Sequence, residues 1–442
     1  MSRITRLTGF PEWLPRERVV EQHVLDTLRQ TFELHGFSGI ETRAVEHVDF
    51  LLRKGEIDKE VYAVRRVHAD ERDHDQLALH FDLTVPFARY VLENAGKLEF
   101  PFKRYQIQKV WRGERPQNGR FREFIQADID VVDRDTLSST FEVELPLVIA
   151  DAFAALDLGQ ARMHVNNRKL AEGFYRGIDI DDAAAVFRHI DKLDKIGPDK
   201  VADLLAADGL TAEQAKQCLA LASISATDES FVDQVRALGV QGDLLDEGLE
   251  ELARVVTAAA EDAPGFLVAD LKIARGLDYY TGTVYETVLA GHEALGSICS
   301  GGRYDKLASD GKTTYPGVGL SIGVSRLVSR LIGEQMVTAT RGVPTAVLVA
   351  VTDEERRRDS DRVAKSLRSR QIPTEVSPSA AKFGKQIKYA DRRGIPFVWF
   401  VGDDGAHEIK DIRSGEQIAA DPETWTPSEA DRLVAVIQKE QS

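Results

Sequence analysis

The sequence predicts an α+β protein: a mostly antiparallel sheet interrupted by a helical insertion, followed by a smaller α/β domain. Three observations lead to this fold class. Residues 104–112 and 121–132 alternate between apolar and polar side chains on either side of a polar turn, which is typical of a β-hairpin. Residues 165–261 carry helical patterns almost throughout. From residue 345 onward, apolar strand patterns alternate with amphipathic helical patterns, as in α/β domains.

The order of these patterns divides the chain of 442 residues into segments that suit two or three domains. We expect the sheet-forming segments on either side of the insertion to build one core, because the sheet pattern stops at the helical segment and resumes after it. The expected boundaries are 1–164 for the first part of the core, 165–262 for the helical insertion, 263–334 for the second part of the core, 335–344 for a linker and 345–442 for the α/β domain.

The composition limits what the protein does. Its formal net charge of -15 argues against indiscriminate binding of nucleic acid, so any RNA contact must be local. No apolar run reaches membrane-spanning length. The two cysteines, Cys218 and Cys299, lie far apart and suit a reducing compartment better than a disulfide framework. The first residues carry neither an apolar signal core nor a long Arg/Ser-rich segment, so we expect a cytoplasmic protein.

A long amphipathic helix is predicted near the start of the chain. Its apolar positions recur at near-helical spacing: Val20, Val24, Leu28 and Phe32. Pro15 suits the first turn of this helix and Gly36 suits its end. A short strand is expected to follow over residues 37–48. Taken alone, the pattern indicates a helix that packs on the core.

The hairpin carries an unusual concentration of positive charge. Between residues 103 and 123 seven side chains are basic and two are acidic, which suggests a polyanionic ligand. Because strand side chains alternate between faces, a guanidinium, a ring, an amide and a carboxylate can share one surface: Arg112, Phe124, Gln126 and Asp130. The opposite face is apolar: Ile125, Ala127, Ile129 and Val131. The pattern predicts either a ligand site on a core-backed sheet or an ordinary hairpin with a solvated face.

Further segments combine glycine or polar side chains with sheet or helix patterns: FDLTVPFARY at 81–90, ARGLDYYTGTVYE at 274–286, SGGRYDKL at 300–307 and YPGVGLSIGVSRLVSRL at 315–331. A strand expected over 77–84 places Asp82 and Thr84 on the same face, although Thr84 also suits the N-cap of the helix that follows. The last segment predicts a glycine-rich strand leading into a helix, where a backbone and a ligand can approach closely.

Taken together, these segments resemble the histidine-specific members of the class II aminoacyl-tRNA synthetases, the histidyl-tRNA synthetase family. RGERPQNGRFREFIQADID, from Arg112 to Asp130, resembles motif 2 of that class. The glycine-rich segment at 315–331 resembles motif 3, and the first helix and strand resemble the dimer-forming motif 1. ARGLDYYTGTVYE resembles the histidine-specific motif of the family. The resemblance covers nearly the whole chain and implies a class II antiparallel-sheet catalytic core with a helical insertion, plus a C-terminal α/β anticodon-binding domain.

This resemblance implies ATP-dependent activation of L-histidine to histidyl-adenylate and transfer to tRNA(His), with ATP as substrate, Mg²⁺, a homodimer and no membrane partner. The implied catalytic residues, on either side of the α-phosphate, are Arg112 and Arg275. The implied ATP-binding residues are Arg112, Glu114, Arg120, Phe124 and Arg326. The implied histidine-binding residues are Asp82, Thr84, Gln126, Asp130, Tyr279 and Tyr280. The implied tRNA-binding residues are Arg115 and Gln117, and no side chain is identified as a metal ligand.

Two other functions remain open at this point. A regulatory subunit of ATP phosphoribosyltransferase resembles the synthetase core but binds rather than reacts, and such regulators typically lack the tRNA-specific apparatus. A sensor of uncharged tRNA would carry a kinase-like segment, which this sequence does not show. The loop ERPQNGR at 114–120, Arg275, the insertion and the C-terminal domain favour the synthetase.

Overall fold

The computed structural model describes residues 5–52, 60–68, 77–117, 119–157, 161–274 and 280–438. The chain separates into two units, one made of Met1–Pro11 and Val24–Leu327 and the other of Glu12–His23 and Val328–Ser442. No helix in the described ranges is long and apolar enough to cross a membrane. The first helix, α1 (Pro15–Leu34), begins at the predicted proline, and its four predicted apolar positions are buried.

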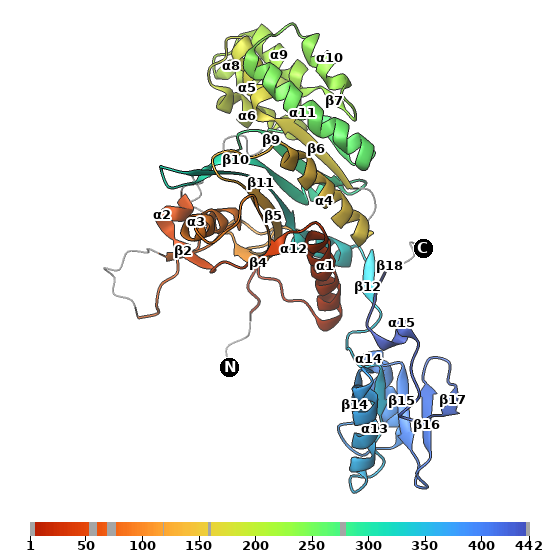
Figure 1. Ribbon diagram of the computed structural model, residues 1–442. Coiled ribbons are helices and arrows are strands. Elements are labelled where there is room, and N and C mark those ends of the chain that lie inside the picture. The colour runs from red at the N-terminus through yellow and green to blue at the C-terminus, as the bar shows by residue number, and fades with distance from the viewer. Residues whose placement is uncertain are drawn as a thin grey trace. The chain divides into compact units, whose positions relative to one another are not determined.

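A mixed, mainly antiparallel sheet forms the centre of the first unit (Figure 1). Within the described residues its nine strands follow the order β1-β4-β5-β11-β10-β9-β6-β8-β7, with parallel pairing between β1 and β4 and between β6 and β8. The strands are β1 Ser38–Gly39, β4 Phe102–Trp111, β5 Glu123–Val132, β6 Ala161–Asn167, β7 Ser225–Ala226, β8 Leu267–Asp270, β9 Thr283–Leu289, β10 Cys299–Ser309 and β11 Thr314–Gly323. A 3-10 turn, η3 (Glu293–Leu295), precedes β10.

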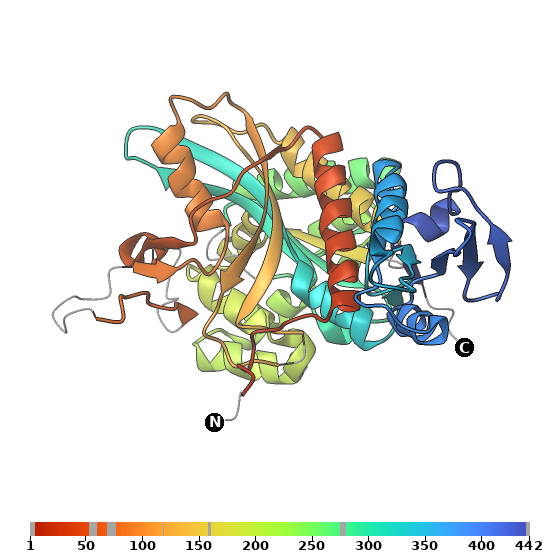
Figure 2. The same ribbon diagram turned by 90° about the horizontal axis from the view of Figure 1, so that it is seen from below.

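Strands β4 and β5 form the predicted hairpin and lie side by side along their whole length (Figure 2). The apolar face of β5 is completely buried at Ala127, Ile129 and Val131. The polar face of β5 is buried too, at Gln126, Asp128 and Asp130, so it is not a solvated face. Helix α4 (Thr140–Leu156) packs against β11 and β6, and helix α3 (Thr84–Asn94) packs against β10. Helices therefore cover part of this sheet, and the polar side chains of the hairpin are held on a packed core.

The helical insertion lies at the β6–β8–β7 edge of the sheet (Figure 1). Its helices are α5 Arg168–Gly177, α6 Ala183–Ile190, α7 Leu193–Ile196, α8 Pro198–Ala207, α9 Ala212–Ala222, α10 Ser230–Arg236 and α11 Asp243–Asp262. The helical run starts where β6 ends, because the side chain of Asn167 accepts hydrogen bonds from the backbone N–H groups of Lys169 and Leu170. Helices α5 and α11 pack closely on each other.

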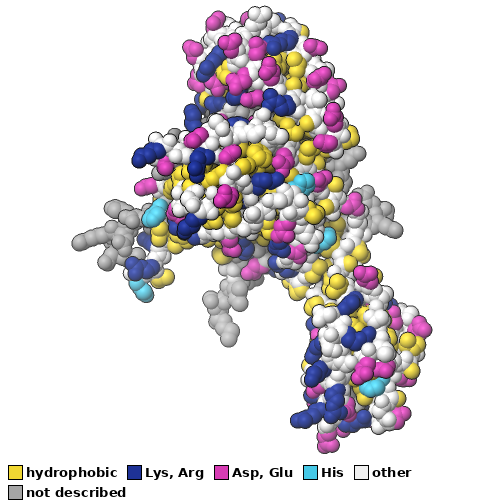
Figure 3. Space-filling view, in the orientation of Figure 1, with side chains coloured by type: hydrophobic (Ala, Val, Ile, Leu, Met, Phe, Trp, Pro, Cys, Tyr) yellow, Lys and Arg dark blue, Asp and Glu magenta, His cyan; other side chains and the backbone are white. Residues whose placement is uncertain are grey.

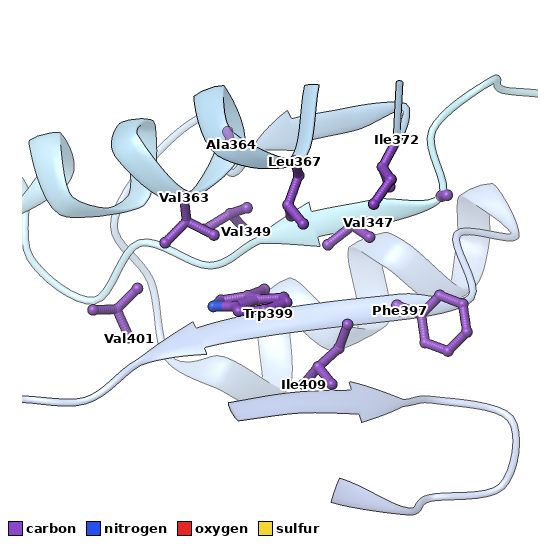
Figure 4. Packing of buried hydrophobic residues seen from close by; sticks show 11 residues of the cluster. Val347, Val349, Val363, Ala364, Leu367, Ile372, Phe397, Trp399, Val401 and Ile409 are labelled. Atoms are coloured by element: carbon purple, nitrogen blue, oxygen red, sulfur yellow. The ribbon is translucent and has the colours of Figure 1, made fainter. Parts of the chain in front are cut away.

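The second unit contains a five-stranded sheet in its described part, in the order β14-β13-β15-β16-β17. Strand β13 runs parallel to β14 and β15, whereas β16 and β17 are antiparallel neighbours. The elements are β13 Val347–Val349, α13 Arg357–Ser369, β14 Thr374–Val376, α14 Phe383–Arg393, β15 Phe397–Val401, β16 His407–Asp411 and β17 Gln417–Ala419. Val363 and Leu367 of α13 lie over Val347 and the buried Trp399 (Figure 4). The predicted alternation of strands and helices is confirmed.

Two predicted strands in the first unit are shorter than expected. The strand expected over residues 37–48 is divided into β1 and β2 (Val45–His47), and α2 (Val48–Leu51) follows. The strand expected over 77–84 is β3 (Leu77–Leu79), which pairs with β2. It ends at Leu79, which pairs with Val45, the first residue of its partner strand β2. Apolar alternation alone does not show where a strand loses its partner.

The junctions of the second unit also differ from the prediction. Within the predicted linker, Val337–Ala339 forms strand β12, which pairs with β18 (Val436–Gln438). The closing helix expected from Pro427 is limited to α15 (Glu429–Arg432), because the chain turns into β18. This pairing joins segments about a hundred residues apart, so a local sequence pattern does not predict it.

Candidate active site

A cavity of about 140 Å³ opens beside the hairpin, between its loop, strands β10 and β11 and the start of helix α12 (Val324–Gly333). Its lining is mostly polar. In the described part of the chain, its charged lining consists of three guanidinium groups and one carboxylate: Arg112, Arg120, Arg326 and Glu114. Such an excess of guanidinium groups suits a polyanion, because each group presents several fixed N–H donors.

Arg112 is held in place at the end of β4. Its Nε donates a hydrogen bond to the backbone oxygen of Phe81 at 3.0 Å. Its guanidinium lies over the ring of Phe124, 5.1 Å from the centroid, which is a cation–π contact. The prediction that Arg112 and Phe124 share one surface is confirmed, and both line the cavity.

Arg326 reaches the same cavity from helix α12. Its Nε donates to the backbone oxygen of Gly119 at 3.2 Å, and its Nη1 donates to that of Ser297 at 2.5 Å. These bonds tie the helix to the hairpin loop and to the segment before β10. Glu114 and Arg120 form a looser ion pair across the loop, with 3.8 Å between Nη1 and Oε2. The predicted ATP-binding side chains are thus brought together.

A second, smaller hollow of about 20 Å³ adjoins the first, and Ser300 and Ser321 line both. It is lined by carboxylates and aromatic hydroxyls, including Asp128, Asp130, Tyr280 and Tyr304, together with Thr84. Asp130 is 2 % exposed and is clamped from two sides. Arg104 approaches one of its oxygens at 2.7 Å, and the Tyr304 hydroxyl donates to the other at 2.6 Å. A charged carboxylate is stabilised there despite its burial.

Glycines make room for these side chains. A Cβ atom at Gly319 would lie 2.0 Å from Oδ1 of Asp130, and one at Gly301 would lie 2.0 Å from the backbone oxygen of Gly319. A Cβ at Gly302 would lie 2.9 Å from the Tyr280 ring. The glycine-rich segments predicted to lie near a ligand therefore serve first to admit the carboxylate and the ring.

Gln126 and Asp128 lie next to each other on the polar face of β5. The Nε2 of Gln126 donates to the Ser321 hydroxyl at 2.6 Å. In the part of the chain that the structure describes, Oε1 of Gln126 and Oδ1 of Asp128 are buried and accept no hydrogen bond. Burial raises the pKa of Asp128 to about 7, with Arg104 opposing this shift and the nearby Asp130 adding to it.

Asp82 and Thr84 stand at the start of α3. Asp82 is 4 % exposed, and one of its oxygens accepts a hydrogen bond from the backbone N–H of Val85 at 3.1 Å. Thr84 is the first helical residue, and the side chain that closes the first turn belongs to Asp82, so the capping role considered for Thr84 was wrong. Their expected placement on one strand face was also wrong, since no strand reaches them.

Tyr280 lies beside the carboxylates of the small hollow. Burial, with the negative charges of Asp130, Asp82 and Asp128 nearby, raises the pKa of its hydroxyl well above the ordinary tyrosine value. Tyr280 is therefore a neutral hydroxyl at neutral pH, able to donate a hydrogen bond. The predicted residues Arg275 and Tyr279 lie outside the described residues. Arg115 and Gln117 are exposed on the hairpin loop.

Sequence reasoning missed Asp128, Arg104, Tyr304 and Ser321. Asp128 has the same strand parity as Gln126 and Asp130, so alternation alone could have placed it on the site face. Arg104 pairs directly opposite Asp130 in the hairpin, which the predicted strands also allowed. Tyr304 and Ser321 come from β10 and β11, and no sequence signal places those strands against the hairpin.

Within the described ranges, no three His, Cys, Asp or Glu side chains come together in a way that could hold a metal ion. Asp82, His80 and Glu46 are buried near one another, but His80 is occupied: Nε2 contacts the backbone oxygen of Lys109 at 2.7 Å and its ring stacks on Trp111. Burial lowers the pKa of His80, so its ring is neutral at neutral pH.

A mainly antiparallel sheet with an arginine-lined cavity beside its hairpin and an adjoining carboxylate hollow is the arrangement of a class II aminoacyl-tRNA synthetase. The family model for histidyl-tRNA synthetase matches residues 9–327, and the model for an anticodon binding domain matches residues 345–434. The chain belongs to the histidyl-tRNA synthetase family.

Relatives resemble the chain over nearly its full length. It is 64% identical to the histidine--tRNA ligase of Micrococcus luteus and 59% identical to that of Cutibacterium acnes, with 99% of each chain covered in both comparisons. A crystal structure of histidyl-tRNA synthetase from Nostoc sp. PCC 7120 superposes with a TM-score of 0.85 at 35% identity, covering 95% of this chain and 97% of that one.

A more distant structure is instructive for the fold. It is described as an ATP phosphoribosyltransferase regulatory subunit/histidyl-tRNA synthetase from Bacillus halodurans C, and it superposes with a TM-score of 0.73 at 16% identity. It covers 87% of this chain and 96% of that chain. The same fold is thus compatible with a regulatory description, so function has to be argued from the site.

Proposed function

We propose that this protein activates L-histidine with ATP to give histidyl-adenylate and then transfers the histidyl group to tRNA(His). One observation carries the proposal: a cavity lined by arginines adjoins a carboxylate hollow, and the two share Ser300 and Ser321. A nucleotide and an amino acid bound in these places would meet at their shared wall. The match to relatives named histidine--tRNA ligase supports this assignment.

The chemistry needs positioning more than proton transfer. A carboxylate oxygen of histidine attacks the α-phosphorus of ATP. A new O–P bond forms as the bond from the α-phosphorus to the oxygen bridging the α- and β-phosphates breaks, and pyrophosphate leaves with that electron pair. The nucleophile is already ionised at neutral pH, so no general base is required. Fixed guanidinium groups can neutralise the charge that develops on the phosphate oxygens. We assign this task to Arg112, whose guanidinium is held by Phe81 and Phe124, and we assign Arg275 to the other side of the α-phosphate.

We assign the remaining nucleotide contacts within the same cavity. Phe124 stacks on the adenine, Glu114 and Arg120 hold the nucleotide, and Arg326 binds the γ-phosphate. The bonds of Arg326 to Gly119 and Ser297 support its role, because they fix its guanidinium at the cavity wall. Mg²⁺ would enter as part of the ATP substrate, and Glu114 is the one carboxylate among the described lining residues of this cavity that could offer it an oxygen.

The carboxylate hollow suits the amino acid. We assign Asp130 and Tyr280 to the two imidazole nitrogens, with Tyr279 beside them, because an ionised acceptor and a neutral hydroxyl donor can satisfy a neutral imidazole ring. Asp82, Thr84 and Gln126 take the α-amino group. Both ring nitrogens of histidine pair with buried polar groups of this site. Amino acids that lack these nitrogens would leave those groups unpaired and are therefore rejected. Selectivity for histidine then needs no separate editing site.

The tRNA contacts and the division of labour along the chain remain part of the proposal. Segments 1–164 and 263–334 form the catalytic core, 165–262 closes over the acceptor end of the tRNA, and 345–442 binds the anticodon. Arg115 and Gln117 meet the extra 5′ guanosine of tRNA(His). Lys and Arg side chains gather on the side of the second unit formed by α13 and α14 (Figure 3), which suits a polyanion. We further propose a cytoplasmic homodimer.

Histidine-dependent exchange between ATP and labelled pyrophosphate tests the activation step. Exchange with L-histidine and with none of the other amino acids is expected. Folded protein that binds histidine but gives no exchange would instead favour a regulatory paralogue. Arg326→Ala should lose exchange by at least a hundredfold through weaker ATP binding, whereas Arg330→Ala, one turn further along α12 and outside the cavity lining, should keep it.

Arg275→Ala gives a second test of the same reaction. It should lose several orders of magnitude in adenylate formation while histidine still binds, because the guanidinium is needed only as charge develops on the α-phosphate. Near-normal turnover in this variant would refute the role of Arg275.

A further inference from the structure

We propose that Asp128 is an additional substrate-binding residue, whose carboxylate accepts a hydrogen bond from the α-ammonium group of the bound amino acid alongside the amide oxygen of Gln126. This inference rests on the proposed function, and it adds a charged partner to the amino-acid site. It does not concern the imidazole side of that site, which Asp130 and Tyr280 occupy.

The position of Asp128 gives the first argument. It lies on β5 midway between Gln126 and Asp130, and the period of a strand points all three to the same face. Asp128 lines the small hollow together with Thr84 and Tyr280. It is 2 % exposed, so its carboxylate is buried almost completely. A substrate in the hollow would therefore be in reach of Asp128.

The second argument is a pair of acceptors without donors. Oδ1 of Asp128 and Oε1 of Gln126 are buried, and neither receives a hydrogen bond from any described residue. Buried polar atoms in folded proteins are nearly always paired, so two unpaired acceptors at one cavity wall suit a donor supplied by a ligand. The guanidinium nitrogens of Arg104 also lack a hydrogen-bond partner among the described residues, but that group lies over the Phe87 ring and pairs by charge with Asp130. An ammonium group carries three N–H donors and no acceptor, which matches this wall.

The Ser321 hydroxyl connects the two side chains. Ser321 lies directly opposite Asp128 in the pairing of β11 with β5. Its oxygen accepts from Nε2 of Gln126 at 2.6 Å, and its own proton is donated to Asp128. Because the Gln126 amide nitrogen is occupied in this way, its oxygen is left for the cavity. Asp128 thereby also holds the neighbouring acceptor in its useful orientation.

The charges around Asp128 give the third argument. The described groups that face it are Arg104 of β4, Asp130 on its own strand, Asp82 before α3, the hydroxyls of Tyr280 and Ser321, and the thiol of Cys299 on β10. Asp128 is thus one of three buried carboxylates in this cluster, and Arg104 contacts the neighbouring Asp130 at 2.7 Å. Burial and the neighbouring carboxylates disfavour the charged form of Asp128, and an ammonium group bound beside it would favour that form.

The decisive experiment compares two ligands on the wild type and Asp128→Asn at pH 8. The ligands are L-histidine and imidazolepropanoate, which is histidine without its α-amino group. Titration calorimetry, or inhibition of exchange where binding is weak, gives the dissociation constants. Asp128→Asn should weaken histidine binding by about ten- to hundredfold, the range for a charged hydrogen bond. Imidazolepropanoate should bind both proteins equally within twofold.

The pH dependence gives an independent readout. Below about pH 7 the wild-type carboxylate takes up a proton and loses its charge. The ratio of histidine dissociation constants, variant over wild type, should therefore fall toward one as the pH is lowered from 8 to 6. Titration of the substrate's own imidazole affects both proteins alike and cancels in this ratio.

The outcomes separate the possibilities. Equal weakening of both ligands, or no weakening of either, would overturn the proposal. Asp270→Asn is the matched control, since it removes another buried carboxylate of the same sheet that bonds His164, and it should leave histidine binding within twofold. If wild-type protein shows no exchange with histidine, the proposed function fails. Normal exchange with an unaffected Asp128→Asn variant removes this inference alone.

A measurement on wild-type protein covers the case in which Asp128→Asn does not fold. Titrations at pH 7 in buffers of different ionisation enthalpy report the protons released on binding. Histidine should release a fraction of a proton that imidazolepropanoate does not, because only the ammonium group favours the ionised form of Asp128. Equal proton release for both ligands would contradict the proposal.

Discussion

Single side chains in this site are defined by what surrounds them more than by their type. Asp130 and Asp128 are neighbours on one strand face, both nearly completely buried, yet they differ in their partners. Asp130 has a guanidinium on one oxygen and a tyrosine hydroxyl on the other. Asp128 has one oxygen without a donor among the described residues. The carboxylate of Asp130 is thus stabilised by its two partners. The carboxylate of Asp128 is costly to keep ionised when no ligand donates to it.

The raised pKa of Asp128 predicts how stability depends on pH. The folded protein holds this proton up to about pH 7, whereas the unfolded chain loses it near the ordinary value of 3.8. The folded state therefore binds more protons between these values, and wild type should lose stability relative to Asp128→Asn as the pH rises from 4 to 8. The difference should be on the order of a few kcal/mol. Urea unfolding at pH 5 and pH 8 measures it, and identical pH dependence in the two proteins would contradict the prediction.

Gly319 gives a second prediction at this scale. Its missing Cβ makes space for the carboxylate of Asp130, which would otherwise meet that atom at 2.0 Å. Gly319→Ala should therefore displace Asp130 from Arg104 and Tyr304 and reduce histidine-dependent exchange by at least a hundredfold, mainly through weaker histidine binding. Gly96→Ala is the control, since nothing lies within 4 Å of the added atom. A Gly319→Ala enzyme with an unchanged KM for histidine would show that the carboxylate tolerates the shift.

Whole elements are joined by a few buried polar links and by close contacts of the backbone. Arg303 of β10 contacts the buried Glu142 of α4 at 3.1 Å and also bonds Asp305. This ties the strand behind the small hollow to the helix that covers the sheet. In the insertion, glycines bring α5 and α11 together: a Cβ at Gly173 would lie 2.4 Å from the backbone nitrogen of Leu245.

The close packing of α5 on α11 predicts that a glycine-to-alanine substitution has opposite effects on stability at this contact and at an exposed helical position. A Cβ at Gly248 would lie 2.1 Å from the backbone nitrogen of Leu170, so Gly248→Ala has to push the helices apart. It should destabilise the protein by about 1–3 kcal/mol, measured by urea unfolding. Gly384→Ala, in the open on helix α14, should instead stabilise by up to about 1 kcal/mol. If Gly248→Ala and Gly384→Ala changed the free energy of unfolding equally, the contact between α5 and α11 would not contribute to stability as proposed.

At the scale of the whole molecule, a net charge of -15 coexists with local basic surfaces. The hairpin loop carries exposed Arg115 and Arg120, and Lys and Arg gather over α13 and α14 (Figure 3). The overall charge repels polyanions at a distance, so under the proposed function these basic places are where we expect the tRNA to bind. Small substrates depend far less on such contacts, because their site is partly buried and less screened by salt.

Salt should therefore separate the two half-reactions. Raising KCl from 50 to 200 mM is expected to increase the KM for tRNA by tenfold or more, through competition of counterions for the phosphates. Histidine-dependent exchange without tRNA should change by less than about twofold in the same buffers. Arg115→Ala should lower the slope of log KM for tRNA against log salt by about one. If salt affects the exchange reaction as strongly as it affects tRNA charging, tRNA binding to the basic surfaces does not explain the salt dependence.

The sequence by itself determined the elements whose signal is local. The alternation around the hairpin predicted β4 and β5 and the face shared by Arg112, Phe124 and Gln126, and the apolar spacing after Pro15 predicted α1, because side-chain direction follows the backbone period. The early end of β3 and the pairing of β12 with β18 escaped prediction, since both depend on partners elsewhere in the chain.

Only the tertiary structure decided which of the side chains on the site face are paired and which are not. Arg104, Asp130 and Tyr304 come from three different strands and form one cluster. Asp128 shares the parity of its neighbours, but its unpaired oxygen and raised pKa arise from its burial in the assembled sheet, beside β11. Periodicity is a property of a few consecutive residues, whereas desolvation and charge pairing depend on every segment packed around a group.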